Sequence, residues 1–322
     1  MRVLLWHVHG SWTTAFVQGG HEVVVPVLPD RGPDGRGRAQ TWSWPDRVVE
    51  LPPDALADAR PDVVILQRPV ELHELCEAWT GLVPGRDVPA VYLEHNAPQG
   101  RIADMRHPAA GRAGLTVCHV THFNALFWDC GGTPVRVIEH GIVDPGPRYT
   151  GELPRAAVVI NEARRRGRVT GTDLLPALER DGVPVDLFGM DAAALGGHEN
   201  LRQDHLHDEL ARRRVYVHPH RWTSLGLSLV EAMHLGMPVV ALATTEAVEA
   251  VPPAAGVIST RPDVLARAAR WFLQDPEAAW TAGACARAHA LGRFGLQRFL
   301  DDWDRLLEEV TDHAHCAGVR AR

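Results

Sequence analysis

The sequence contains no lysine, so all 33 cationic side chains among its 322 residues are arginines. Any phosphate that the protein binds through a side-chain cation must therefore be held by Arg or His, and otherwise by backbone N–H groups. The 40 acidic residues outnumber the arginines and give a formal net charge of −7. This balance argues against a nucleic-acid-binding protein, which usually presents a basic face to the phosphate backbone.

Cysteines and long hydrophobic runs are also scarce. The five cysteines are scattered and form no C-x-x-C pair, so the sequence indicates neither a disulfide framework nor a zinc knuckle. A reducing cytoplasm is the expected location. No window approaches the roughly 18 uncharged apolar residues that a membrane span needs, and the apolar run after Met1 is too short for a signal-peptide core. We therefore expect no integral membrane association.

The residues that are present are typical of a globular α/β protein. The chain is 45% hydrophobic and 23% charged, which is enough apolar surface for a real core. At about 150 residues per domain, its length predicts two domains. Short apolar runs, such as 90–93 and 239–243, alternate with helical patterns. Such runs are typical of parallel sheets that helices cover on both faces.

This pattern is interrupted once, by a Pro- and Gly-rich stretch at residues 141–155, and then begins again. We therefore expect two doubly wound, Rossmann-like domains, 1–150 and 151–295, that face a central cleft. The long amphipathic segment 296–311 is expected to be a helix that crosses back to the N-terminal domain, and 312–322 to be a flexible tail. In such folds ligands bind beyond the carboxyl ends of the strands.

The most informative segment is the stretch from Arg221 to Ala241. A polar loop with Gly226 leads into the predicted helix 227–235, which a glycine terminates. The loop amides of Leu225 to Leu227, with the helix dipole behind them, would form an anion site suited to a diphosphate. Glu231 lies about one turn into the helix. Its carboxylate is placed to accept hydrogen bonds from sugar hydroxyls, as an acidic residue does for a ribose in other nucleotide folds.

This segment resembles the donor-binding motif of the family 4 glycosyltransferases, which have the GT-B fold and the pattern E-x-F-G-x-x-x-x-E-A-M-x-x-G-x-P-V-V-A. The residues in register with that pattern are Gly226, Glu231, Ala232, Met233, Gly236, Pro238, Val239, Val240 and Ala241. Two further stretches, 136–142 and 171–175, resemble the family's linker and a helix start. The resemblance implies an N-terminal acceptor domain and a C-terminal domain that binds the nucleotide sugar. It also implies transfer with retention, no metal and no cofactor.

The resemblance also implies site residues. The positions expected to bind the donor are Gly10, Thr170, Gly171, Thr223, Ser224, Leu225, Gly226, Leu227 and Glu231. The expected catalytic residues are His95, near the donor sugar, and two arginines that clamp the diphosphate. By spacing we favour Arg165 and Arg168, with Arg164 and Arg166 as close rivals. A plainer interpretation stays open for three of these assignments. His95 could be a structural histidine, the arginine run a solvated face, and Gly10 part of a simple tight turn.

Three positions depart from the family pattern. Leu225 replaces the Phe of the motif, a mild change if the backbone N–H is what counts. Thr223 stands where the family has the first Glu of its motif, which approaches the donor sugar. A threonine there leaves room for a modified sugar and makes activity with plain glucose or mannose donors doubtful. Thr170 stands in place of the diphosphate-binding Lys, so that the neighbouring arginines must supply that charge.

Some patterns imitate metal sites. His218 and His220 are two residues apart, as are His205 and His207, but no third ligand has fitting spacing. Asp302-Trp303-Asp304 imitates the D-x-D metal motif of a different glycosyltransferase fold, yet it lies in an amphipathic helix and indicates a solvated acidic face. We expect no metal.

The expected function is sugar transfer from a nucleotide-diphosphate donor to an acceptor. The N-terminal half has no basic amphipathic helix that would indicate a lipid surface, so the expected acceptor is a soluble small molecule. Two alternatives stay open: a GT-B sugar-nucleotide epimerase, and a non-catalytic nucleotide-sugar binder, which Thr223 makes plausible.

Overall fold

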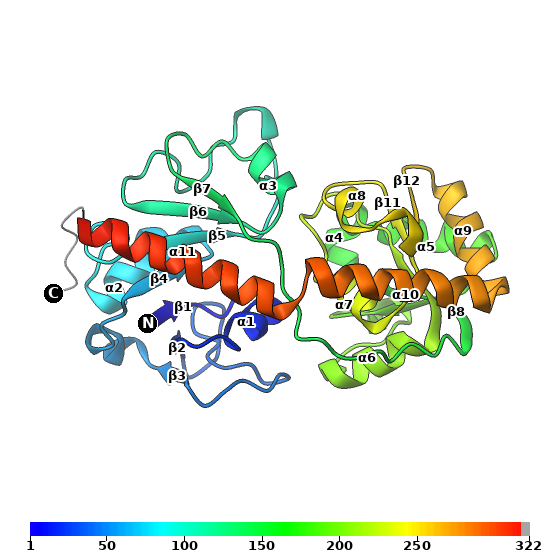
Figure 1. The fold of residues 1–322 in the computed structure, drawn as a ribbon, viewed down its shortest axis with the longest axis horizontal. Coiled ribbons are helices and arrows are strands. Elements are labelled where there is room, and N and C mark those ends of the chain that lie inside the picture. Colours follow the sequence, from blue (N-terminus) through cyan, green and yellow to red (C-terminus); the bar gives the residue numbers. More distant parts are fainter. Residues whose placement is uncertain (317–322) are drawn as a thin grey trace. The chain divides into compact units, whose positions relative to one another are not determined.

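The computed structural model describes residues 1–316 and separates into two units (Figure 1). The first unit contains residues 1–141 together with the C-terminal helix from Leu296, and the second contains Ile142–Gly295. The chain therefore passes into the second unit after Gly141 and leaves it after Gly295. No helix within residues 1–316 is long and apolar enough to cross a membrane.

The sheet of the first unit has seven strands in the described residues, all parallel, in the order β3-β2-β1-β4-β5-β6-β7. They are β1 (Arg2–Leu5), β2 (Glu22–Pro26), β3 (Val48–Leu51), β4 (Val63–Leu66), β5 (Ala90–Glu94), β6 (Leu115–His119) and β7 (Val135–Val137). The helical segments of this unit are α1 (Gly10–Phe16), η1 (Pro53–Asp58), η2 (Glu71–Leu75), α2 (Cys76–Thr80), η3 (Ile102–Asp104), α3 (His122–Phe127) and α11 (Leu296–Cys316).

The second unit, described throughout residues 142–295, has a parallel sheet of five strands in the order β12-β11-β10-β8-β9. They are β8 (Leu153–Val159), β9 (Val185–Phe188), β10 (Arg213–His218), β11 (Val239–Leu242) and β12 (Gly256–Ser259). Its helical segments are α4 (Ala163–Thr170), η4 (Thr172–Leu174), α5 (Leu175–Arg180), η5 (Ala193–Leu195), α6 (Gln203–Arg212), α7 (Leu227–Leu235), α8 (Ala247–Ala250), η6 (Pro253–Ala255), α9 (Pro262–Gln274) and α10 (Pro276–Arg293).

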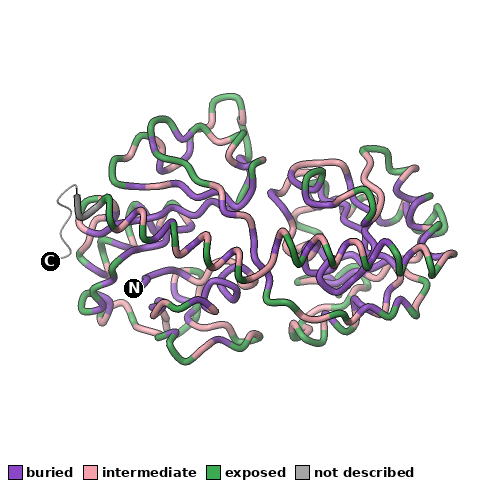
Figure 2. Tube along the Cα trace, in the orientation of Figure 1, coloured by how far each residue is buried: buried purple, intermediate pink, exposed green. Residues whose placement is uncertain are grey.

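Alternating residues of each central strand enter two separate cores. In and just after β1, Val3 and Leu5 pack in one hydrophobic cluster with α1 and α11, whereas Leu4 and Trp6 pack in the other with η1 and α2. In the second unit α7 and α10 cover one face of the sheet, and α5 and α9 cover the other. The buried strands run through the interior of each unit (Figure 2). The expectation of parallel sheets covered on both faces is confirmed.

The unit boundary differs from the predicted one by nine residues. We expected the first domain to end at residue 150, but the second unit begins at Ile142. The backbone N–H of Tyr149 donates to Leu235 O at 3.1 Å, and that of Thr150 donates to Ala211 O at 2.9 Å. These hydrogen bonds attach the Pro- and Gly-rich stretch to the second unit.

The C-terminal helix is also longer than expected. We expected it to end at residue 311, but α11 continues to Cys316. Hydrogen bonds extend it, since Thr311 Oγ1 donates to Leu307 O at 2.8 Å and the His313 ring bonds with Glu309 O at 2.6 Å. The part of the predicted tail at 317–322 lies outside the described residues.

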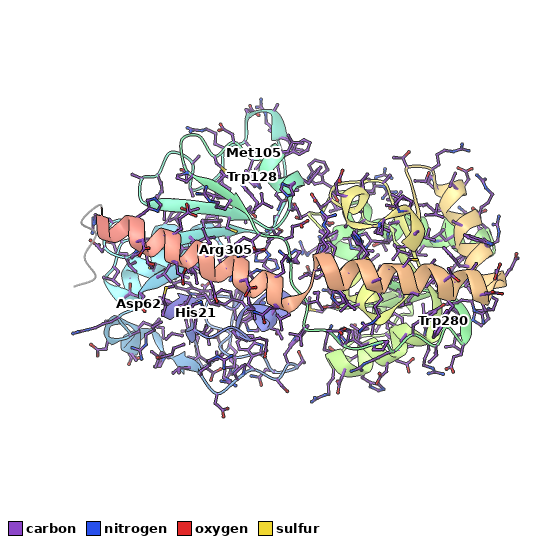
Figure 3. The ribbon with its side chains drawn as sticks, viewed as in Figure 1. His21, Asp62, Met105, Trp128, Trp280 and Arg305 are labelled. Carbon is purple, nitrogen blue, oxygen red and sulfur yellow. The ribbon has the colours of Figure 1, made fainter. Side chains whose placement is uncertain are left out.

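Aromatic side chains fasten α11 to the first unit. Trp303 is 1% exposed, and its ring centroid lies 5.3 Å from that of Trp12 and 5.5 Å from that of Phe16. On the outer side of the helix, Asp304 Oδ1 lies 2.9 Å from Nε2 of His21, which Figure 3 labels. Although α11 comes after the whole second unit in the chain, it completes the core of the first.

Replacing Trp303 with Ala should therefore destabilise the first unit. Removing a fully buried Trp costs about 3–5 kcal/mol in free energy of unfolding, measured by urea denaturation. The matched control is Trp280→Ala, because Trp280 of α10 is 60% exposed (Figure 3) and should change stability by less than about 1 kcal/mol. Equal effects of the two changes would contradict the packing described for α11.

Candidate functional site

The segment that carries the sequence motif joins β10 to α7. Gly226 occupies the N-cap position of α7 with φ −68° and ψ 119°, and no side chain of the described residues caps the helix. A Cβ at Gly226 would lie 2.5 Å from Cε1 of His218, so glycine is required for the loop to approach that ring. Uncapped N–H groups at the start of a helix form an anion site.

Glu231 is buried in α7 and held by two residues of α6. Its side chain is 5% exposed, and Gln203 Nε2 donates to Glu231 Oε2 at 3.0 Å. His207 Nε2 lies 3.6 Å from the same oxygen and 2.8 Å from Gln203 Nε2. The sequence analysis did not predict Gln203, and it considered His207 only as a metal ligand. The sequence does contain one indication of this pair: Gln203 and His207 are four residues apart, a spacing that places both on one face of a helix.

The two favoured arginines lie in α4 with carboxylate partners. Arg165 is bound to Glu162, with its Nε donating to Glu162 Oε1 at 2.9 Å, and its side chain is 69% exposed. Arg168 is 81% exposed and lies 3.1 Å from Asp173 Oδ2. Asp173 also binds Arg221, through two further hydrogen bonds. Both predicted diphosphate ligands are therefore already paired with acidic residues.

Arg166 differs from its neighbours. It is partly buried, and its guanidinium has no ion pair with a carboxylate in the part of the chain that the structure describes. Burial, followed by the nearby charge of Arg165, lowers the pKa of Arg166 from its ordinary value. Its charge also reaches His220 strongly enough to help lower the pKa of that ring. An unpaired, partly desolvated cation is well suited to bind an anion.

Thr170 and Gly171 connect α4 to the motif loop. Thr170 is fully buried, and its hydroxyl donates to Gly167 O at 3.3 Å, so it supports the backbone and supplies no charge. Gly171 has φ +75°, and a Cβ there would lie 2.0 Å from Pro219 O. The backbone N–H of Arg221 donates to Val169 O at 2.9 Å. The arginine segment and the motif loop are therefore in direct contact.

Unpaired neutral polar atoms collect beside the motif loop. The Oγ1 of Thr223 and the Nδ1 atoms of His218 and His220 are buried without a hydrogen-bond partner among the described residues. The two imidazole rings stack with centroids 4.2 Å apart. Burial lowers the pKa of His218 to about 3, so the ring is uncharged at neutral pH. Of the other predicted loop residues, Ser224 and Leu225 are buried, and Leu227 is partly exposed.

The histidine pairs do not assemble a metal site. Among the side chains that the structure describes, no group of three or more His, Cys, Asp or Glu is arranged to hold a metal ion. His205 and His207 lie two residues apart on α6 and point to different environments, one exposed and one buried. In the D-x-D imitation, Asp302 binds Arg298 at 2.8 Å.

In the first unit, His95 lies directly after the last residue of β5. Its side chain is 7% exposed, its Nε2 lies 2.9 Å from Gln67 Oε1, and its ring centroid lies 3.8 Å from that of His9. Burial, with smaller contributions from His9 and His140, lowers the pKa of His95 well below its ordinary value. His95 is therefore neutral at pH 7 and cannot supply a positive charge there.

Gly10 opens α1 directly after the His9 N-cap. A Cβ at Gly10 would meet Trp42 Nε1 at 3.5 Å, an ordinary contact distance, and its φ is not in the left-handed region. The backbone therefore does not require glycine at this position. The reading of Gly10 as a simple tight turn loses its support, and its role in donor binding stays a prediction.

Known structures share this architecture. Sucrose-phosphate synthase from Thermosynechococcus elongatus superposes with a TM-score of 0.70 at 13% sequence identity, over 97% of this chain and 99% of that one. HepE from Anabaena, solved in complex with UDP-glucose, superposes with a TM-score of 0.68 at 14% sequence identity. The superposition covers 96% of this chain and 100% of HepE. A glycosyltransferase from Rickettsia africae superposes with a TM-score of 0.63 at 12% sequence identity, over 96% of this chain and 98% of that one. The fold is the GT-B fold.

The family model that matches the sequence covers part of the second unit. Residues 197–289 match the family model described as glycosyl transferases group 1. This stretch contains α6 and α7, and with them Gln203, His207 and Glu231, but not the arginines of α4. No curated protein matches the whole sequence significantly. The family match and the GT-B fold together support a glycosyltransferase.

Proposed function

We propose that this protein is a retaining glycosyltransferase of the family 4 type. It moves a sugar from a nucleotide-diphosphate donor to a small-molecule acceptor without a metal ion or another cofactor. The observation that carries the proposal is the buried carboxylate of Glu231, one turn behind the uncapped N-terminus of α7. This arrangement suits a nucleoside diphosphate, whose phosphates and ribose hydroxyls need an anion site and a hydrogen-bond acceptor a short distance apart.

The leaving diphosphate needs stabilisation as the bond to the sugar breaks and negative charge collects on its oxygen. In this chain the N–H groups at the start of α7 supply part of that stabilisation, because they are uncapped and fixed in direction. Arg166 supplies a positive charge from α4, and Arg165 and Arg168 can add theirs by exchanging a carboxylate partner for phosphate. Hydrogen-bond donors that already point at the leaving diphosphate before the reaction need little reorganisation during it.

The function is tested by incubating the protein with UDP-, GDP- and ADP-sugars in the absence of an acceptor. A transferase slowly releases free nucleotide and free sugar, because water replaces the acceptor. An epimerase yields a new nucleotide sugar and releases no nucleotide. A non-catalytic binder gives neither product, although the donor raises its unfolding temperature. We expect the first outcome, and either of the others would contradict the proposal.

Glu231→Ala should weaken nucleoside diphosphate binding about ten- to a hundredfold, because a hydrogen bond to a charged group contributes about 1.5–3 kcal/mol. Isothermal titration calorimetry measures the change. Glu249→Ala removes an exposed carboxylate from the same unit and should leave the affinity unchanged. Unaltered affinity in a folded Glu231→Ala protein would show that this carboxylate does not contact the nucleotide.

Arg166→Ala should lower the affinity for a nucleoside diphosphate about ten- to a hundredfold and leave the affinity for the nucleoside unchanged. Arg165→Ala and Arg168→Ala should have smaller effects on binding, because each of these side chains must first give up its carboxylate. The affinities are compared by calorimetry with UDP and uridine, or with the nucleotide that the donor experiment selects. Equal affinity of the wild type for nucleoside and nucleoside diphosphate would mean that no phosphate is recognised.

Thr223 bears on the choice of donor sugar. Its side chain is short and uncharged, and its hydroxyl, which is both a donor and an acceptor, is buried without a partner among the described residues. We expect low activity with UDP-glucose or GDP-mannose and higher activity with an amino, deoxy or heptose donor. Thr223→Glu should impair transfer from the preferred donor, whereas Thr223→Ser should not. If the wild type is fully active with UDP-glucose and Thr223→Glu leaves transfer unchanged, then Thr223 does not select the donor sugar.

A further inference from the structure

A buried glutamine, Gln67, is hydrogen-bonded to His95. Its side-chain amide donates one hydrogen bond and accepts another. Gln67, which is 5% exposed, follows β4 in the chain. Its Nε2 lies 2.6 Å from the backbone oxygen of Trp6, and its Oε1 lies 2.9 Å from Nε2 of His95. A carbonyl oxygen can only accept a hydrogen bond, so the amide nitrogen of Gln67 must face Trp6. The amide oxygen must therefore face His95.

This orientation determines where the proton of His95 lies. The Oε1 of Gln67 can only accept, so the Nε2 of His95 must carry a hydrogen. In the neutral ring the other nitrogen, Nδ1, is then unprotonated and offers a lone pair. This Nδ1 has no hydrogen-bond partner in the part of the chain that the structure describes, and it is not among the fully buried unpaired atoms.

We propose that Gln67 is a positioning residue that holds His95 in its Nε2-protonated tautomer, so that Nδ1 accepts a hydrogen bond from a sugar hydroxyl. The inference rests on the proposed function for the identity of the substrate group, but not for the tautomer. A lone pair recognises a hydroxyl or another donor and rejects a phosphate or carboxylate oxygen. His95 would then select and orient a hydroxyl rather than stabilise the leaving diphosphate.

The backbone around Gln67 is fixed as well. The carboxylate of Glu71 is fully buried and accepts the backbone N–H of Gln67 at 2.6 Å and that of Arg68 at 3.2 Å. The Nε of Arg68 donates to the other oxygen of Glu71, also at 2.6 Å. These bonds hold the backbone from which the side chain of Gln67 extends to His95.

Burial, with smaller contributions from two neighbouring histidines, keeps the ring of His95 neutral. His95 faces His9, at the start of α1, and His140, which follows β7. Burial lowers the pKa of His9 to about 4 and that of His140 to about 3, with further lowering by Arg36 and Arg298 respectively. Each of these neighbours disfavours a second proton on His95. The neutral tautomer is therefore the relevant state throughout the neutral pH range.

The direct test is nitrogen-15 NMR of the free protein with labelled histidine, in which the two tautomers have different ring-nitrogen shifts. The wild type should show His95 protonated at Nε2 and unprotonated at Nδ1 at pH 7. Gln67→Met, which keeps the length but removes the acceptor, should give a mixture of tautomers. Gln18→Met, a change just beyond the C-terminal end of α1, is the matched control and should keep the wild-type spectrum. A wild-type ring protonated at Nδ1, or an unchanged tautomer in Gln67→Met, would overturn the proposal.

Kinetics give a second readout. Gln67→Met should lower kcat about two- to tenfold, the range expected for one misdirected hydrogen bond, with little change in nucleotide affinity. Gln67→Glu keeps the acceptor but adds a negative charge, which favours protonated His95 and should move the acid limb of the pH–rate profile to higher pH. An acid limb that does not move would contradict the link between Gln67 and His95. The NMR result needs no turnover, so failure of the proposed transferase function would remain distinguishable from failure of this inference.

Discussion

Every strand of both sheets in the described chain runs parallel to its neighbours, and this constraint decides where polar groups can gather. Parallel strands need crossover connections, so helices cover both faces and the strands become apolar throughout. Strands such as β4 and β11 are apolar throughout, and several buried polar side chains lie where strands end. His95, Gln67 and His218 all occupy such positions, at or just after the carboxyl ends of β5, β4 and β10.

The absence of lysine shapes the electrostatics of these strand ends. Around the motif loop of the second unit, Arg165, Arg168 and Arg221 pair with neighbouring carboxylates, whereas the partly buried Arg166 forms no ion pair among the described residues. Beside it, His218 and His220 are neutral because burial disfavours their charged forms. A cation without a carboxylate partner keeps more of its positive field for a bound anion than one that is already paired.

The elements that the sequence predicted best are those with local signals. The helix at residues 227–235 was predicted with its observed bounds, because Gly226 and Gly236 mark its two ends in the sequence itself. By contrast, Asp263 is of a residue type that often caps helices, yet α9 begins at Pro262 with no side-chain cap, and Asp275 caps α10 by accepting from Ala278 N. Several aspartates could serve as caps, and only the folded backbone decides between them.

Long-range contacts could not be predicted in this way. Gln67 and His95 are 28 residues apart, as are Gln203 and Glu231, and no spacing rule connects either pair. The predicted unit boundary differs from the observed one for a similar reason. The Pro and Gly content of the segment does not reveal that the backbone N–H groups of Tyr149 and Thr150 donate to distant backbone oxygens.

In both pairs a glutamine amide lies behind a functional side chain and fixes it without adding charge. Gln203 donates to the carboxylate of Glu231, and Gln67 accepts from the imidazole of His95. An arginine behind Glu231 would compete for the carboxylate with a far stronger bond, and a glutamate behind His95 would favour its protonation. A neutral amide gives direction at little electrostatic cost. In the proposed function, Glu231 then accepts from the ribose while it is held by Gln203, and the neutral ring of His95 accepts from a sugar hydroxyl.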